Sequence, residues 1–170
     1  WHYLYKLGDR PVPLDGAYLP CPISSGKVGY AGDMVQHTPY RDDQFKHVYG
    51  WVARHKNPVD DSWMIQLRSN TNCSAILAWQ APVTGRISLH ISTYAKPDGS
   101  NRKGTLTIQR TGPFETLMEK RVQENESVDV NLSDITVKPG DRIYIIGSYH
   151  PDYVAMMLKT MKIKLESLAE

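Results

Sequence analysis

The segment GRISLHIST, residues 85–93, decides the fold class of this 170-residue chain. Its apolar side chains, Ile87, Leu89 and Ile91, occupy every second position and alternate with polar ones. The polar positions are Ser88, His90 and Ser92. Because successive side chains of a β-strand point to opposite faces of a sheet, the segment predicts a strand with one face in a core and the other face in water.

Similar short apolar runs recur along the chain. They lie at residues 62–69, 74–82, 104–110, 127–132, 141–148 and 160–167. Clusters of Pro, Gly, Asp and Ser, such as the one at residues 97–100, separate the runs and are typical of turns. No segment keeps the 3.6-residue repeat of a helix over three turns, so we expect short helices at most. The sequence predicts an all-β fold, an antiparallel β-sandwich of the jelly-roll type with about eight to ten strands.

The first sixty residues have a different character, because prolines interrupt them. These prolines are Pro11, Pro13, Pro20, Pro22 and Pro39. Proline has no N–H to donate to a neighbouring strand, which excludes a central strand over residues 10–33. We expect long irregular loops within a single domain that spans residues 1–170. Since the chain starts at Trp1 rather than at Met, we also expect it to be a fragment of a longer multidomain protein.

The charge balance excludes two classes of partner. Lys and Arg number 20 and Asp and Glu number 18, which gives a net charge of +2 without a basic stripe. A nucleic-acid-binding surface would need such a stripe. No apolar run approaches the roughly 20 residues that a membrane-spanning helix requires. Neither nucleic acid nor a membrane span is therefore expected.

The sequence contains no strong cofactor motif. No two of the six histidines form an H-x-x-x-H pair, and a G-x-S-x-G elbow and a P-loop are missing. The acidic pairs Asp42-Asp43 and Asp60-Asp61 would suit an oxygen-liganded calcium ion, with solvated turn residues as the alternative. We expect no required cofactor, and structural calcium at these pairs is left open.

The two cysteines leave a second alternative open. Cys21 and Cys73 are too few for a disulfide scaffold. A single bridge between them would be ordinary in a secreted protein, whereas two buried free thiols would be ordinary in any protein. The spacing does not decide between a bridge and free thiols.

A polysaccharide lyase on a jelly roll is the enzymatic alternative. Gln66, Arg86, His90 and Tyr94 are the strand residues with the side chains for it. A glycosidase would instead need two carboxylates in one groove, and Asp129 is one of few acids on an alternating strand. Since neither set meets the geometric requirements of a catalytic centre, we expect no enzymatic activity.

The aromatic residues carry the remaining signal, because the chain has four Trp and ten Tyr but only two Phe. Tyr and Trp combine an apolar ring face with a polar group, which suits half-exposed surfaces and the C–H face of a sugar ring. Five residues lie where apolar strands meet polar loops: Trp51, Trp63, Tyr149, His150 and Tyr153. We predict that they form a carbohydrate-binding site, with a role in the core as the alternative for each ring.

Several short motifs resemble one known class of protein. They are the opening Trp-x-Tyr-x-Tyr, WQAPVTGRISLHI at residues 79–91, VKPGDRIYIIGS at residues 137–148 and the final alternating strand. In this order they resemble the non-catalytic β-sandwich carbohydrate-binding modules of bacterial secreted polysaccharide-degrading enzymes. The resemblance implies a secreted or extracellular jelly roll that binds a polysaccharide or oligosaccharide and is attached to a catalytic domain. A structural or protein-interaction β-sandwich, such as a spacer or a viral or cell-surface appendage domain, is the alternative.

Two groups of aromatic residues are assigned to the core. Trp1, Tyr3 and Tyr5 share one face of the first strand with Leu7, and we predict that this row faces the core rather than a sugar. Trp79 is the clearest core candidate, because it is in step with apolar residues of its strand.

Overall fold

A computed structural model gives the backbone of nine segments of the chain. They are residues 2–7, 19–20, 35–37, 51–56, 63–68, 73–96, 103–112, 114–149 and 155–168. Side chains are described for residues 64–67, 74–95, 103–112, 114–148 and 156–168. Every regular element in these segments is a strand, which confirms the predicted all-β fold.

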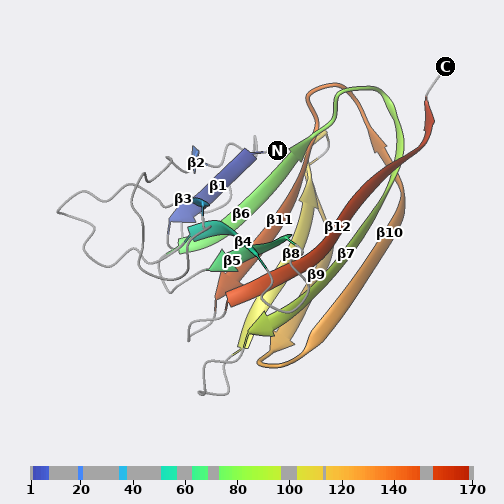
Figure 1. The fold of residues 1–170 in the computed structure, drawn as a ribbon. Coiled ribbons are helices and arrows are strands. Elements are labelled where there is room, and N and C mark those ends of the chain that lie inside the picture. The colour runs from blue at the N-terminus through green and yellow to red at the C-terminus, as the bar shows by residue number, and fades with distance from the viewer. Residues whose placement is uncertain are drawn as a thin grey trace.

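The strands form two sheets of six strands each, and all strand pairs are antiparallel. The β6 sheet contains, in spatial order, β2 (Leu19–Pro20), β1 (His2–Leu7), β6 (Cys73–Gln80), β11 (Arg142–Tyr149), β8 (Lys103–Arg110) and β9 (Glu115–Gln123). The β7 sheet contains, in spatial order, β10 (Ser127–Val137), β7 (Gly85–Lys96), β12 (Ala155–Leu168), β5 (Trp63–Arg68), β4 (Trp51–Lys56) and β3 (Val35–His37). Figure 1 shows the two layers, with the long strands β7, β10 and β12 side by side.

The number of strands exceeds the predicted eight to ten. The described segments hold twelve, of which ten have six or more residues. The two short ones, β2 and β3, lie at sheet edges within the proline-rich first sixty residues. Pro20 ends β2 at such an edge, the position in a sheet where a residue without an N–H is tolerated. Sequence periodicity does not reveal strands of two or three residues.

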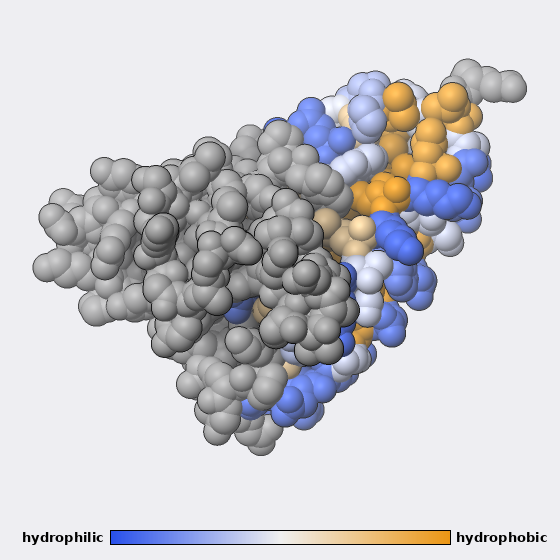
Figure 2. All heavy atoms as spheres, in the orientation of Figure 1, coloured by the Kyte–Doolittle hydropathy of each residue, from blue (hydrophilic) through white to orange (hydrophobic). Residues whose placement is uncertain are grey.

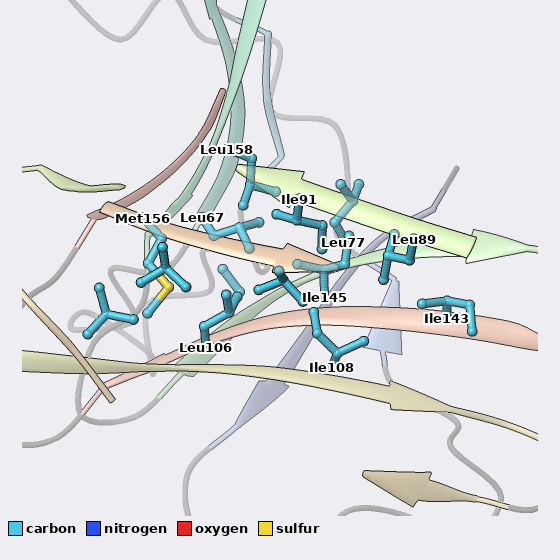
Figure 3. Packing of buried hydrophobic residues seen from close by; sticks show 14 of the residues in the cluster. Leu67, Leu77, Leu89, Ile91, Leu106, Ile108, Ile143, Ile145, Met156 and Leu158 are labelled. Atoms are coloured by element: carbon cyan, nitrogen blue, oxygen red, sulfur yellow. The ribbon is translucent and has the colours of Figure 1, made fainter. Parts of the chain in front are cut away.

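One core fills the space between the sheets. The β6 sheet contributes buried side chains such as Leu77 and Ile145, and the β7 sheet contributes Leu67, Leu89 and Ile91. Figure 3 shows these side chains meeting between the strands. Each fully buried Leu or Ile stabilises the fold by about 1.5–3 kcal/mol relative to an exposed one. The predicted inward face of residues 85–93 is confirmed.

A second apolar cluster lies on the outer side of the β6 sheet. It consists of Ile76, Ala78, Tyr144 and Ile146, with Phe114 packed against it. All four are buried, and the alternating residues of β6 and β11 are buried in the main core. The central strands of this sheet are therefore buried on both faces, which is why their sequences AILA and IYII do not alternate.

The aromatic residues assigned to the core are described in part. Trp79 is partly buried and packs against the main core. In the pairing of β1 with β6, Tyr3 lies opposite Leu77 and Tyr5 lies opposite Ala75. Trp1 and the side chains of Tyr3 and Tyr5 lie outside the described residues, so the direction of this row stays a prediction.

The described segments contain no helix of the length and apolarity that crossing a membrane requires.

Candidate functional site

The outer side of the β7 sheet is polar, and we call it the polar face. Its members come from β7, β10 and β12: Arg86, Ser88, His90, Ser92, Tyr94, Asp129, Asn131, Asp134, Lys159, Thr160, Lys162, Lys164 and Glu166. On β7 these residues alternate with the buried residues of the core, as the sequence predicts. All thirteen side chains are exposed or partly exposed.

Strand register brings residues from three distant parts of the chain into rows across this face. In one row, Asn131 of β10 lies opposite His90 of β7, which lies opposite Lys162 of β12. Adjacent strands are about 4.8 Å apart, so this row places an amide, an imidazole and an ammonium group within reach of one small ligand.

A β-bulge in β12 puts the lysines on the polar face. The register of β12 against β7 shifts between Leu158 and Thr160, so Lys159 is an extra residue without a partner. Without it, strict alternation from the buried Leu158 would turn Met161 and Ile163 to the outside and Lys162 to the inside. The bulge restores Met161 and Ile163 to positions packed against the core and leaves the lysines outside.

Two further register shifts border the polar face. One lies in β12 between Leu165 and Ser167, and the other lies in β10 between Leu132 and Ile135. In the second, Asp134 adopts a left-handed backbone conformation with a φ of 58°, which Asp tolerates better than most residues. Asp134 Oδ1 is 3.4 Å from Arg86 Nη1, and both side chains are largely exposed.

His90 is held in one orientation by Asn131. The Nδ1 atom of the ring is 2.7 Å from Asn131 Oδ1. A carboxamide oxygen only accepts hydrogen bonds, so Nδ1 carries the hydrogen and Nε2 is left for a further partner. A neutral His90 presents Nε2 as an acceptor for a ligand hydroxyl.

A second fixed group lies one row away. The Ser88 hydroxyl donates a hydrogen bond to Glu166 Oε1 at 2.7 Å, and Lys164 Nζ is 3.6 Å from the same oxygen. The hydrogen bond from Ser88, and then the charge of Lys164, hold the pKa of Glu166 below its ordinary value of 4.5. Glu166 is therefore a carboxylate, and thus a hydrogen-bond acceptor, at neutral pH.

An aromatic ring also belongs to the face. Lys159 Nζ lies 4.6 Å from the centroid of the Tyr94 ring, a cation–π contact. Tyr94 is half-buried and lies opposite Met157, which in turn lies opposite Gln66 of β5. Met157 and Gln66 are buried, so the face changes from open at Lys162 to covered at this row.

The residues predicted from the sequence to bind sugar are placed only in part. Trp51 pairs with Arg68 and Trp63 pairs with Lys56, so their backbones lie at opposite ends of the β4–β5 pair, about 17 Å apart. Tyr149 ends β11 in the other sheet, where it pairs with Gly104. The side chains of these three residues, and all of His150 and Tyr153, lie outside the described residues. The predicted site therefore stays a prediction.

The strand residues considered for lyase chemistry are spread out. Arg86, His90 and Tyr94 share the polar face, but each is four residues from the next, about 13 Å along the strand. Gln66 is buried two strands away from Tyr94, in the row that Met157 bridges. A base and an acid about 13 Å apart cannot act on the same sugar atom, so these four residues do not form one catalytic cluster.

The metal and cysteine alternatives fall mostly outside the described part of the chain. Asp42-Asp43, Asp60-Asp61 and Cys21 lie there, as does the side chain of Cys73. Within the segments that the structure describes, no three His, Cys, Asp or Glu side chains are grouped as metal ligands. Structural calcium at the acidic pairs, and the choice between a disulfide and free thiols, therefore stay open.

Sequence reasoning missed the contribution of β12 to the polar face. The alternation of Met161, Ile163 and Leu165 with lysines is visible in the sequence and identifies a strand. The pairing of β12 with β7, and the bulge at Lys159, join residues about sixty or more positions apart. Periodicity within one segment carries no signal for either.

Comparison with known proteins identifies the fold. No protein-family model matches the sequence, and no curated protein matches it. Among solved structures, the CBM22-1 xylan-binding domain of Paenibacillus barcinonensis Xyn10C is similar with a TM-score of 0.50 and 13% identity, over 82% of this chain and 98% of that one. The chain therefore has the β-sandwich fold of this carbohydrate-binding module.

Two further structures have lower scores. The C-terminal family 22 carbohydrate binding module of Clostridium thermocellum Xyn10B gives a TM-score of 0.45 at 14% identity, over 84% of this chain and 92% of that one. The enzymatically active domain of tailspike protein 4 of bacteriophage CBA120 gives 0.44 at 10% identity, over 78% of this chain and 19% of that one.

Proposed function

We propose that this chain is a non-catalytic carbohydrate-binding module that directs an attached catalytic domain to a polysaccharide. The observation that carries the proposal is the polar face on a β-sandwich fold shared with a xylan-binding module. There, hydrogen-bonding side chains whose positions are fixed by strand pairing share one side of the sheet with the ring of Tyr94. Sugars need this combination, since each hydroxyl must exchange water for a protein hydrogen bond.

The aromatic residues Trp51, Trp63, Tyr149 and Tyr153, with His150, are proposed to stack on the sugar rings. Two features of the backbone support a contribution from Trp51. It belongs to the β7 sheet, where it pairs with Arg68 of β5. Arg68 is two positions along β5 from Gln66, and Gln66 lies in the row that contains Met157 and Tyr94. A Trp51 ring on the outer side of the sheet would add a stacking surface next to the covered, Tyr94 end of the polar face.

The test is affinity electrophoresis of the chain against plant, algal and bacterial polysaccharides. We expect retardation on at least one of them, with a dissociation constant in the micromolar to millimolar range. Replacing a stacking ring, as in Trp51→Ala, should weaken binding by about 1–3 kcal/mol and leave the melting temperature nearly unchanged, by analogy with bases that stack on aromatic rings. Migration unchanged on every polysaccharide would refute the proposal.

One observation favours the alternative, a protein-interaction β-sandwich. Val83, Leu165 and Leu168 are exposed by 38%, 43% and 64%. Leu165 and Leu168 lie near the end of β12, and Leu168 pairs with Gly85, two residues after Val83. Figure 2 shows hydrophobic residues gathered toward this end of the molecule. A stable oligomer in sedimentation experiments, together with failure to bind any polysaccharide, would favour this alternative.

A further inference from the structure

We infer that the polar face binds an anionic polysaccharide, whose carboxylate or sulfate groups are held by Lys159 and Lys162. The inference rests on the proposed carbohydrate-binding function and names the chemical class of its ligand.

Some charged side chains of the polar face form ion pairs with each other, and others do not. Arg86 pairs with Asp134, and Lys164 pairs with Glu166. Asp129 is exposed on β10, two strands and about 10 Å from β12. Within the described residues, neither Lys159 nor Lys162 has a carboxylate partner. The centre of the face on β12 is therefore positive and open.

The bulge at Lys159 is the structural basis of this positive centre. It places Lys159 and Lys162 on the same side of β12, although strict alternation puts residues three apart on opposite sides. The Lys159 ammonium group lies over the Tyr94 ring, in a cation–π contact. This contact uses no hydrogen-bond acceptor, so the N–H groups of the ammonium are left for an anion.

The second lysine has a neighbour suited to a sugar. Lys162 lies opposite His90, whose Nδ1 is engaged by Asn131 and whose Nε2 is left for a ligand. The two lysines are three residues apart, and the bulge shortens their separation along the strand to roughly 8 Å. At that separation they would bind different anionic groups of one polymer rather than share one group. An anionic chain lying along β12 meets both.

The experiment uses pairs of polysaccharides that differ only in charge. Polygalacturonate is compared with its carboxyl-reduced form, and dextran sulfate with dextran, by affinity electrophoresis and titration calorimetry of the full chain. We expect at least one charged polymer to bind about tenfold more tightly than its neutral partner, and binding to weaken as salt screens the exposed charges. The first pair identifies carboxylate as the group bound, and the second identifies sulfate.

Variants separate a specific site from general attraction. Lys159→Gln and Lys162→Gln should each weaken binding to the charged polymer about two- to fivefold, as expected for exposed charge pairs. Lys103→Gln is the matched control, because Lys103 is an exposed lysine on the β6 sheet. It should leave affinity unchanged, and all three variants should keep the melting temperature of the parent chain.

The other outcomes are decisive as well. Equal binding to the charged and neutral members of both pairs would overturn the anionic ligand and leave the proposed carbohydrate-binding function standing. A preference for charge to which Lys103 contributes as much as Lys159 and Lys162 would show general attraction and overturn the assigned site. Failure to bind any of the four polymers or any other polysaccharide would refute the proposed function itself.

Discussion

The outer sides of the two sheets differ although the sheets share one core. On the β6 sheet, Tyr144 and Ile146 are buried in a second apolar cluster. On the β7 sheet, the corresponding side carries His90, Lys162 and their polar neighbours, all at least partly exposed. The sequences differ accordingly: β11 contains the uninterrupted apolar run IYII, whereas apolar and polar residues alternate in β7. A strand buried on both faces therefore has a continuous apolar sequence, and a strand buried on one face has an alternating one.

The largest expected effect separates two tyrosines, one from each outer side. Tyr144→Ala should lower the free energy of unfolding by about 3–5 kcal/mol, because the ring is 1% exposed within the second cluster. Tyr94→Ala on the polar face should cost on the order of 1 kcal/mol, because its ring is only half-buried. Urea unfolding of both variants measures the difference. Equal losses would mean that the two outer sides are equally buried.

A smaller effect separates two neighbours on β7. A Cβ atom at Gly85 would overlap the carbonyl oxygen of Ser167 and lie 2.8 Å from Leu165 Cδ1, so β12 would have to shift. Gly85→Ala should therefore cost about 1–3 kcal/mol. Arg86→Ala points the other way and loses only an exposed ion pair, so it should change stability by less than about 0.5 kcal/mol. Thermal unfolding of both variants measures the difference. If the arginine variant is the less stable of the two, then β7 does not tolerate substitution better at the exposed Arg86 than at the crowded Gly85.

The smallest effect is a pH dependence in the turn that joins the sheets. Glu126 accepts a hydrogen bond from the Gln123 N–H at 2.9 Å and pairs with Lys120 at 3.2 Å. These contacts, the backbone hydrogen bond first, hold the pKa of Glu126 below its ordinary value of 4.5. A lowered pKa in the folded state stabilises the fold above the unfolded value, and the contribution disappears as the pH falls through the folded value.

Glu126→Gln should therefore lower stability by less than about 1 kcal/mol at about pH 7, since the group is partly solvated. The difference in unfolding free energy between the variant and the parent chain should disappear at pH values well below 4.5, where the parent carboxylate is protonated and uncharged. Urea titrations at both pH values measure it. Glu166→Gln, on the open polar face, is the comparison and should show the same sign with a smaller size. A gap that widens in acid would contradict the assignment.

Much of the fold could be predicted from the sequence, and less of the candidate site. The strand at residues 85–93, its buried Leu89 and its exposed His90 follow from a repeat that needs no knowledge of partners. Trp79 was predicted to belong to the core and packs against it. Leu165 alternates as predicted but is 43% exposed. Among the described strands, β5 pairs with β12 only as far as Leu158, which leaves this end less covered.

The sequence by itself determined where strands form and which of their sides is apolar, because both are encoded in side chains two positions apart along one segment. Only the tertiary structure decided that Asn131, His90 and Lys162 form a row. It also decided that the bulge at Lys159 brings its ammonium group over Tyr94. Such contacts depend on which strands pair and in what register. The long-range packing of the whole core selects both, and local periodicity does not.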